Sequence, residues 1–236
     1  MASEAALRSL RLRIEFNIEH LGGLLRFLDQ SVLAAQKAQD DQLHSLDEAL
    51  TNYYGDDLWT DADVEFAMGI YGEDPDHPNA PFLPFPDEYP RIVRNSFVFL
   101  SATLLEDELR RWCDAVAQAR GLPLRTARRD AGVLDGLRAY LRAVGYWTVP
   151  VPLWQRCKDL FQFRNSIAHA GARLSLNRWP TVRDALRREP LVSTSARSPT
   201  TEGVLVFSAG YCAELVSLLS DFFAAVFRGS DAPPRS

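Results

Sequence analysis

Three residues that could do chemistry together stand within six positions of one another in the stretch FQFRNSIAHA, residues 161–170. Arg164 can hold a phosphate and stabilise charge that develops on it. His169 can move a proton near neutral pH, and Asn165 can fix either side chain by a hydrogen bond. These side chains suffice for RNA cleavage without a metal, because the ribose 2′-OH supplies the nucleophile that attacks the adjacent phosphate.

The helix that must carry these residues is predicted to open at Pro150 and Pro152 and to stop at Gly171. On a helical wheel with about 100° per residue, Arg164 lies at the centre of an apolar stripe. The stripe consists of Leu153, Cys157, Leu160, Phe161, Ala168 and Gly171. An unpaired buried guanidinium is costly, so Arg164 requires a buried carboxylate, a partner subunit or a bound phosphate.

The other two residues lie on a flank of the same wheel. Asn165 is about 100° and His169 about 140° from Arg164, and Lys158 shares their flank. A straight helix therefore does not direct Arg164 and His169 to one point. Either the helix bends near the motif, or two copies face each other across a two-fold axis and complete each other's site.

The charge of the chain is unevenly distributed. The net charge is −5, yet residues 110–188 hold 16 Lys and Arg against 5 Asp and Glu, a net of +11. Residues 1–109 hold 7 against 21, a net of −14. The basic segment contains the motif and is almost all arginine, which suits phosphate binding. The alternative is that the basic and acidic segments pair with each other.

The spacing of apolar residues predicts a mostly helical chain. A long helix is expected over residues 4–37, a second from Asp40 and Asp41 to Tyr54, and a short third over 61–71. Further helices are expected over 91–119 with a stop at Gly121, over 130–145, over 181–188 and over 209–228. A stripe in the helix over 91–119 should be buried: Val98, Ala102, Leu105, Leu109, Trp112 and Val116.

The remaining segments separate these helices. Six prolines between Pro75 and Pro90 predict an irregular loop, so we expect an acidic helical region at 1–75, a loop at 76–90 and a helical core at 91–228. Residues 191–208 are expected to form a β-hairpin before the last helix, and residues 229–236 a disordered tail. We expect the apolar last helix to be a core helix with a polar stripe of Glu214, Ser217 and Asp221, rather than a membrane span.

Several classes of protein are disfavoured by what the sequence lacks. Three widely spaced cysteines without a CxxC pair argue against disulfides and a zinc site, and for a reducing cytoplasm. The four histidines show no metal-ligand spacing, and no nucleotide-binding glycine motif is present. The first twenty residues do not form a secretory signal. We therefore expect a cytoplasmic protein that uses no metal and no cofactor.

The segment RNSIAH resembles the Rx4-6H motif of HEPN domains (higher eukaryotes and prokaryotes nucleotide-binding), and the resemblance covers roughly residues 91–228. It implies an all-α bundle and a homodimeric, metal-independent endoribonuclease of toxin–antitoxin or antiviral defence systems, with RNA as substrate. It also implies that Arg164 and His169 are the catalytic pair and Asn165 their polar neighbour. An acidic residue on an earlier helix often faces the motif in this family, which favours Glu106, with Glu108 as the alternative; Lys158 is a supporting residue.

One position departs from the family pattern, and two other readings stay open. Toxins that are paired with a nucleotidyltransferase antitoxin commonly carry tyrosine two residues after the histidine, where this chain has Gly171. That departure argues against this mode of control. The chain could also be a non-catalytic HEPN-like protein that binds a nucleotide or RNA or serves as a scaffold with a partner from a defence operon. A helical interaction protein, docking a partner through its acidic region, is the third possibility.

Overall fold

The computed structural model describes residues 2–54, 88–121, 132–174, 179–195 and 203–231, and these are mostly helical. The predicted all-α fold with a short hairpin before the last helix is confirmed. The elements are α1 (Ala2–Tyr54), α3 (Glu88–Arg120), α4 (Val133–Ala143), α5 (Val151–Ala170), β1 (Arg173–Leu174), α6 (Trp179–Arg188), β2 (Val192–Thr194), β3 (Gly203–Phe207) and α7 (Ala209–Asp231).

The N-terminal region differs from the expectation in one respect. A single helix of 53 residues, α1, replaces the two expected helices, so the predicted break at Asp40 is wrong. Aspartate caps the start of a helix when the residues before it are not helical. Here the residues before Asp40 are helical, and the helix continues past it. The expected helix over 61–71 and the loop as far as residue 87 lie outside the described residues. Pro90 lies in the first turn of α3, where proline is tolerated.

The chain divides into two units. One contains Met1–Arg26 and Arg94–Ser236, and the other contains Phe27–Val93. The motif and the helices around it all belong to the first unit. In the second unit, the structure describes the later part of α1 and the first turns of α3.

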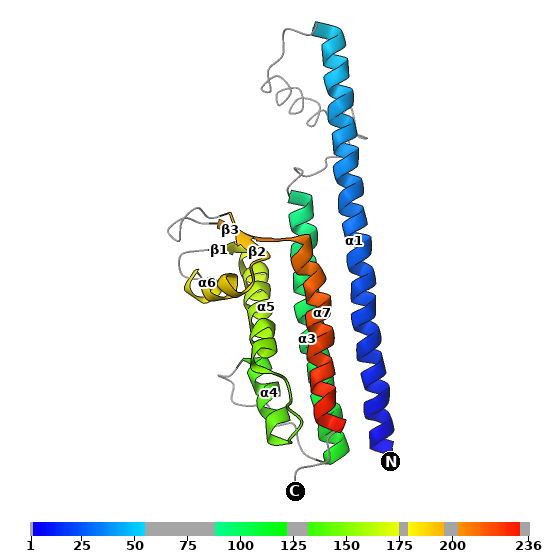
Figure 1. The fold of residues 1–236 in the computed structure, drawn as a ribbon, viewed down its shortest axis with the longest axis vertical. Coiled ribbons are helices and arrows are strands. Elements are labelled where there is room, and N and C mark those ends of the chain that lie inside the picture. The colour runs from blue at the N-terminus through cyan, green and yellow to red at the C-terminus, as the bar shows by residue number, and fades with distance from the viewer. Residues whose placement is uncertain (1, 55–87, 122–131, 175–178, 196–202, 232–236) are drawn as a thin grey trace. The chain divides into compact units, whose positions relative to one another are not determined.

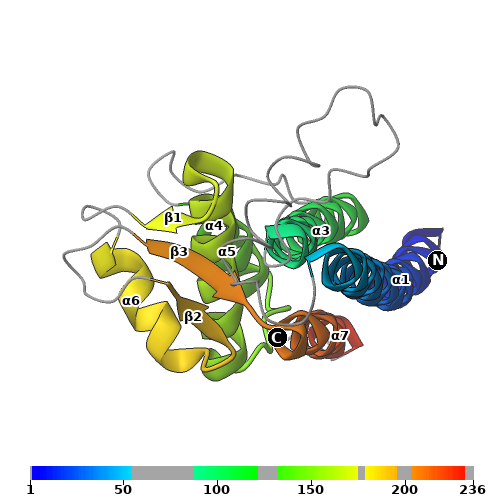
Figure 2. The ribbon, with the colours of Figure 1, turned by 90° about the horizontal axis from the view of Figure 1, so that it is seen from above.

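The core of the first unit lies between α3, α5 and α7, with the start of α1 packed against α3 and α7 (Figures 1 and 2). The predicted stripe of α3 is confirmed as buried, since each of its six side chains is at most 1% exposed. Aromatic rings join the helices: Trp112 of α3 contacts Phe227 of α7 at 4.8 Å between ring centroids. On the other side of α7, Phe222 stacks with Trp154 of α5 at 6.3 Å. Burial of such large rings is the main stabilising contribution to this core.

The helix α7 is buried on one side and polar on the other. Its length and composition would allow it to cross a membrane. However, 56% of its apolar 18-residue stretch is buried inside the protein. The expected polar residues Glu214, Ser217 and Asp221 are all exposed, whereas Leu215, Leu218 and Phe222 are buried. The helix extends to Asp231, so the first residues of the expected tail are helical, and residues 232–236 lie outside the described part.

The end of α5 leads directly into a small sheet with strand order β1-β3-β2. The hairpin of β2 and β3 was expected, and β1 adds a third, antiparallel strand beside β3. Gly171 ends α5 with φ 57°, and the next residue, Ala172, also has a positive φ of 67°. The N–H groups of Gly171 and Ala172 donate to the carbonyls of Ile167 and Ser166, which satisfies the last turn of the helix.

The shorter helices α4 and α6 differ in length from the predictions. Gly121 ends α3 with φ 62°, as its sequence position predicts. The helix expected over residues 130–145 is the shorter α4, and the helix expected at 181–188 begins two residues earlier as α6. Figure 2 shows α6 and the sheet on the side of α5 that faces away from α3. The motif helix is therefore held between an all-helical layer and a small mixed one.

Candidate functional site

The buried face of α5 does not centre on Arg164, which corrects the helical-wheel prediction. Its buried side chains are Trp154, Cys157, Asp159, Leu160, Phe163 and Ser166. Arg164 is half-buried at the edge of this face, and Ala168 of the predicted stripe is exposed. The wheel failed because it counted apolar residues only, whereas the real face includes Asp159 and Ser166.

Arg164 lies beside α3 rather than in the centre of the core. Its guanidinium is 5.2 Å from the ring centroid of Phe99, a cation–π contact. Its Nη1 donates a hydrogen bond of 3.2 Å to Oδ1 of Asn165. Its Nε is buried and has no hydrogen-bond acceptor among the described residues. No carboxylate of the described part of the chain lies within 4.0 Å, so the charge of Arg164 is not neutralised there.

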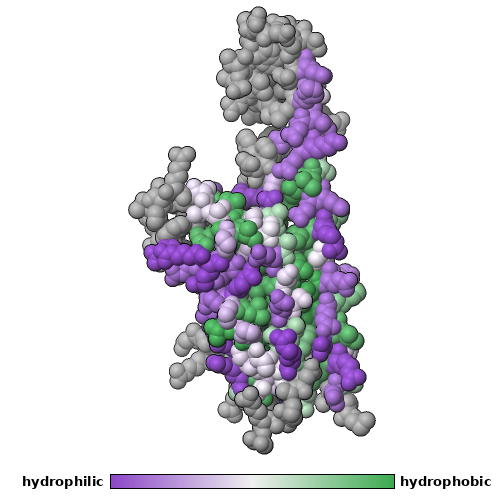
Figure 3. All heavy atoms as spheres, in the orientation of Figure 1, coloured by the Kyte–Doolittle hydropathy of each residue, from purple (hydrophilic) through white to green (hydrophobic). Residues whose placement is uncertain are grey.

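Two nearby arginines have a different role. Arg188 of α6 donates two hydrogen bonds, of 2.8 and 2.7 Å, to the buried carboxylate of Asp159. Arg156 of α5 donates 2.9 and 3.2 Å bonds to Glu189 and a 2.6 Å bond to Glu214. The hydrogen bonds to Glu189 and to Asp159 are the main causes that raise the pKa of Arg156 and Arg188, respectively. These pairs are structural, and the exposed face of α6 is strongly hydrophilic (Figure 3).

A cavity of about 300 Å³ lies where α3, α5 and the start of α4 meet. It brings together four of the six candidate residues named from the sequence: Arg164, Asn165, Lys158 and Glu106. The residues that also line it are Gly132, Val133, Leu134, Asp135, Phe161 and Gln162. The cavity thus combines two cations and two carboxylates with amide and apolar side chains.

The structure distinguishes the two acidic candidates of α3. Glu106 lines the cavity and is held by a 3.0 Å ion pair with Arg110. Glu108 is fully buried on another face of the helix, where Asn17 of α1 donates a 2.9 Å bond and Arg111 a 2.7 Å bond to its carboxylate. Glu108 therefore ties α3 to α1, and Glu106 is the carboxylate that is placed near Arg164.

His169 is separated from the other motif residues. It is exposed in the last turn of α5, and it is not among the residues that line the cavity. The helix runs without interruption from Val151 to Ala170, so both residues stay on one regular helix. One copy of the chain therefore does not assemble Arg164 and His169 at one point of this cavity.

Two residues near Arg164 gave no signal in the sequence, and the sequence predicted only the position of a third, Gln162. Phe99 and Asp135 come from helices far from the motif in the chain, and no periodicity connects them with it. Gln162 lies on the expected flank of α5, but its buried Oε1, which has no donor among the described residues, is visible only in the structure. In the described ranges, no three His, Cys, Asp or Glu side chains form a group that could hold a metal ion.

Cys113 of α3 and Cys157 of α5 are buried, and their thiols are unreactive in character. Burial, followed by the charge of Asp114, raises the pKa of Cys113 to about 12. Burial also raises the pKa of Cys157 far above the ordinary range of a thiol. A thiol that stays protonated is a poor nucleophile, so these residues serve packing.

Comparison with known proteins adds no further assignment, because no family model, no curated protein and no solved structure matches the chain.

Proposed function

We propose that this protein is a metal-independent endoribonuclease of the HEPN type, which acts as a homodimer. The observation that carries the proposal is that Arg164 has no carboxylate partner among the described residues. This arginine lines an open cavity with no carboxylate within 4.0 Å in the described ranges, whereas Arg156 and Arg188 are each bound to buried carboxylates. A cation that lacks a counter-ion and faces a cavity is suited to a phosphate of a substrate.

The proposed reaction needs only groups that the chain and the RNA supply. The 2′-OH loses its proton and attacks the adjacent phosphorus, the bond to the 5′-oxygen breaks, and a 2′,3′-cyclic phosphate and a 5′-OH form. Arg164, oriented by its hydrogen bond to Asn165, stabilises the charge on the phosphate oxygens. Lys158 adds a second positive charge in the same cavity. His169 moves the proton of the 2′-OH or of the leaving oxygen.

The position of His169 supports a site shared by two chains. His169 is exposed and does not line the cavity of its own copy, so a second copy must bring its histidine to Arg164. In a two-fold dimer each copy would complete the site of the other. A role in toxin–antitoxin or antiviral defence rests on the family resemblance alone and is part of the same proposal.

The test is incubation of purified protein with total RNA in EDTA, with wild type, Arg164→Ala and His169→Ala compared. We expect cleavage by the wild type only, with products that end in a cyclic phosphate. The matched control is Arg142→Ala, which removes an exposed arginine from the last turn of α4, outside the cavity. Its activity should equal that of the wild type. Undiminished cleavage by His169→Ala would refute the proposal.

A second experiment tests the shared site. Arg164→Ala and His169→Ala chains are co-expressed, so that mixed dimers form. Half of the dimers are then mixed, and each carries one intact site of two, so about a quarter of the wild-type activity should return. No recovery, despite dimers that contain both chains, would contradict a site built from two copies.

A second candidate function is nucleotide or RNA binding without catalysis. The observation in its favour is that a single copy assembles Arg164, Lys158 and Asn165 but not His169. This alternative predicts RNA binding that weakens steeply with salt and is lost in Arg164→Ala, with no cleavage by any variant.

A further inference from the structure

We propose that the cavity beside Arg164 binds a single guanine nucleotide, with its phosphate at Arg164 and Lys158 and its base at Asp135. The proposal extends the function proposed above, since it uses the same cavity, but it concerns the base rather than the reaction. At about 300 Å³ the cavity is at the lower end of the range of small-molecule sites. That volume suits one unstacked nucleotide of a single strand and not a duplex.

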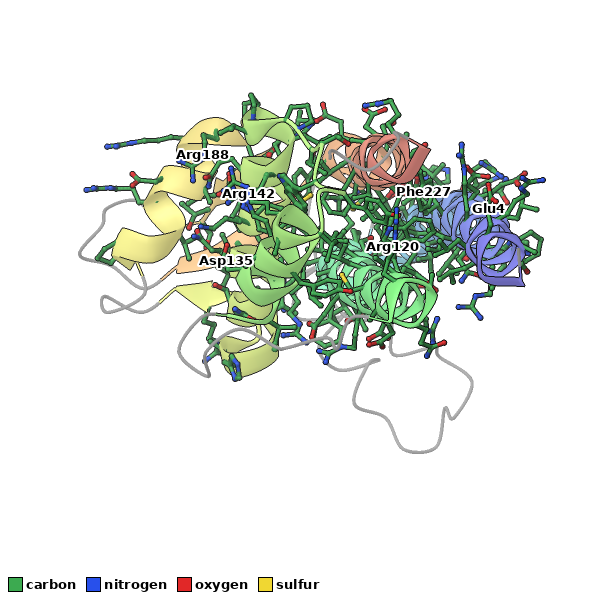
Figure 4. All side chains as sticks on the ribbon, turned by 90° about the horizontal axis from the view of Figure 1, so that it is seen from below. Glu4, Arg120, Asp135, Arg142, Arg188 and Phe227 are labelled. Carbon is green, nitrogen blue, oxygen red and sulfur yellow. The ribbon has the colours of Figure 1, made fainter. Side chains whose placement is uncertain are left out.

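The charges in the cavity are not paired with one another. Neither Lys158 nor Arg164 lies within 4.0 Å of a described carboxylate, and Glu106 is already bound to Arg110. Asp135, in the first turn of α4 (Figure 4), forms no hydrogen bond or ion pair with any described residue. The cavity therefore offers cations for an anionic group of a ligand and a separate carboxylate for its hydrogen-bond donors.

Two buried polar atoms of cavity residues also lack partners. Oε1 of Gln162 has no donor and Nε of Arg164 no acceptor among the described residues. Such unsatisfied groups are costly. Both atoms are buried, so a ligand bonds to them only after the side chains of Gln162 and Arg164 turn toward the cavity. Between these polar groups, Val133, Leu134 and Phe161 provide apolar surface against which a flat base can pack.

Guanine is the base that fits a free carboxylate best. Its N1–H and N2–H₂ groups lie side by side and can donate to the two oxygens of Asp135 at once. Adenine and cytosine each present only one amino group on that edge, next to an acceptor that a carboxylate repels. Uracil presents one N–H between two carbonyl oxygens. A carboxylate accepts and does not donate, so it discriminates in favour of guanine.

The experiment measures binding of GMP, AMP, CMP and UMP to the full chain in EDTA by calorimetry. We expect GMP to bind the wild type at least about tenfold more tightly than the other three, the effect of one bidentate contact. In Asp135→Asn, where one acceptor becomes a donor, the preference should fall below about threefold, because GMP loses one contact and the amide now complements the amino group and the neighbouring acceptor of AMP, whose affinity should not fall. Equal binding of all four nucleotides to the wild type would overturn the inference.

The controls separate this inference from the proposed function. Asp221→Asn removes an exposed carboxylate of α7 outside the cavity and should keep the preference for GMP. Asp135 is itself exposed, so its replacement should not unfold the chain, and Asp135→Ala provides a second test of the same contact. RNA cleavage without preference for guanine would refute the inference alone. Preferential GMP binding without RNA cleavage would refute the endoribonuclease alone.

Discussion

Removal of one partner of the ion pair between Arg188 and Asp159 should be among the most destabilising single replacements in this chain. Asp159 is fully buried, and its two oxygens accept 2.8 and 2.7 Å bonds from Arg188 and a 3.1 Å bond from Gln155. In Arg188→Ala only the neutral donor of Gln155 remains for a buried carboxylate. Removal of one partner of a buried pair costs about 3–5 kcal/mol. Because the Arg188 side chain is 41% exposed, water can replace part of it, so we expect about 3 kcal/mol.

The measurement is urea unfolding followed by circular dichroism, with the free energy of unfolding extrapolated to water. The matched control is Arg164→Ala, which loses one hydrogen bond and one cation–π contact and should cost less than about 1.5 kcal/mol. The double replacement Asp159→Leu with Arg188→Met should return to within about 1 kcal/mol of the wild type, because no buried charge remains. A loss below about 1 kcal/mol in Arg188→Ala would refute the reasoning.

Two further predictions concern the end of the motif helix and the buried thiols. Gly171→Ala should lower the free energy of unfolding by about 1 kcal/mol, since alanine is strained at φ 57°; urea unfolding measures the loss, and an unchanged value would contradict the strain argument. Cys113 has a folded-state pKa of about 12 against 9.0 when unfolded, so the folded state keeps its proton longer and stability falls as pH rises above 9. The contribution of Cys113 should approach about 1.4 kcal/mol per pH unit. Because the buried Cys157 adds a loss of its own, the measurement is the difference between wild type and Cys113→Ala in urea unfolding between pH 8 and 10.5, and equal pH dependence of the two chains would contradict the prediction.

The long helices could be predicted because local residues fix their ends. Gly121 and Gly171 adopt the positive φ that their positions after helices indicate, and Pro150 and Pro152 open α5. The break at Asp40 was wrong because a start signal is only a local preference, which a continuous helix overrides. The strand β1 could not be predicted from two residues, since it exists through pairing with β3.

The sequence predicted some of the residues that line the cavity, but not their arrangement. The motif singled out Arg164 and Asn165, the helical wheel Lys158 and the family resemblance Glu106, and all four line one cavity. The orientation of α5 was not predictable, because Asp159 belongs to the buried face only through Arg188, which comes from another helix. Such long-range pairs leave no trace in the periodicity of a single helix.

The junction between α5 and β1 has a consequence for the order of folding. The carbonyl of Ala172 accepts a hydrogen bond from the N–H of Leu205, so the end of the motif helix is fixed by a strand about 30 residues later in the chain. A contact with that separation forms late, after the loop between its ends has closed. The last turn of α5 is itself closed by the local hydrogen bonds of Gly171 and Ala172, so an incomplete chain that ends before β3 can form the motif helix but lacks the bond that fixes the chain directly after it.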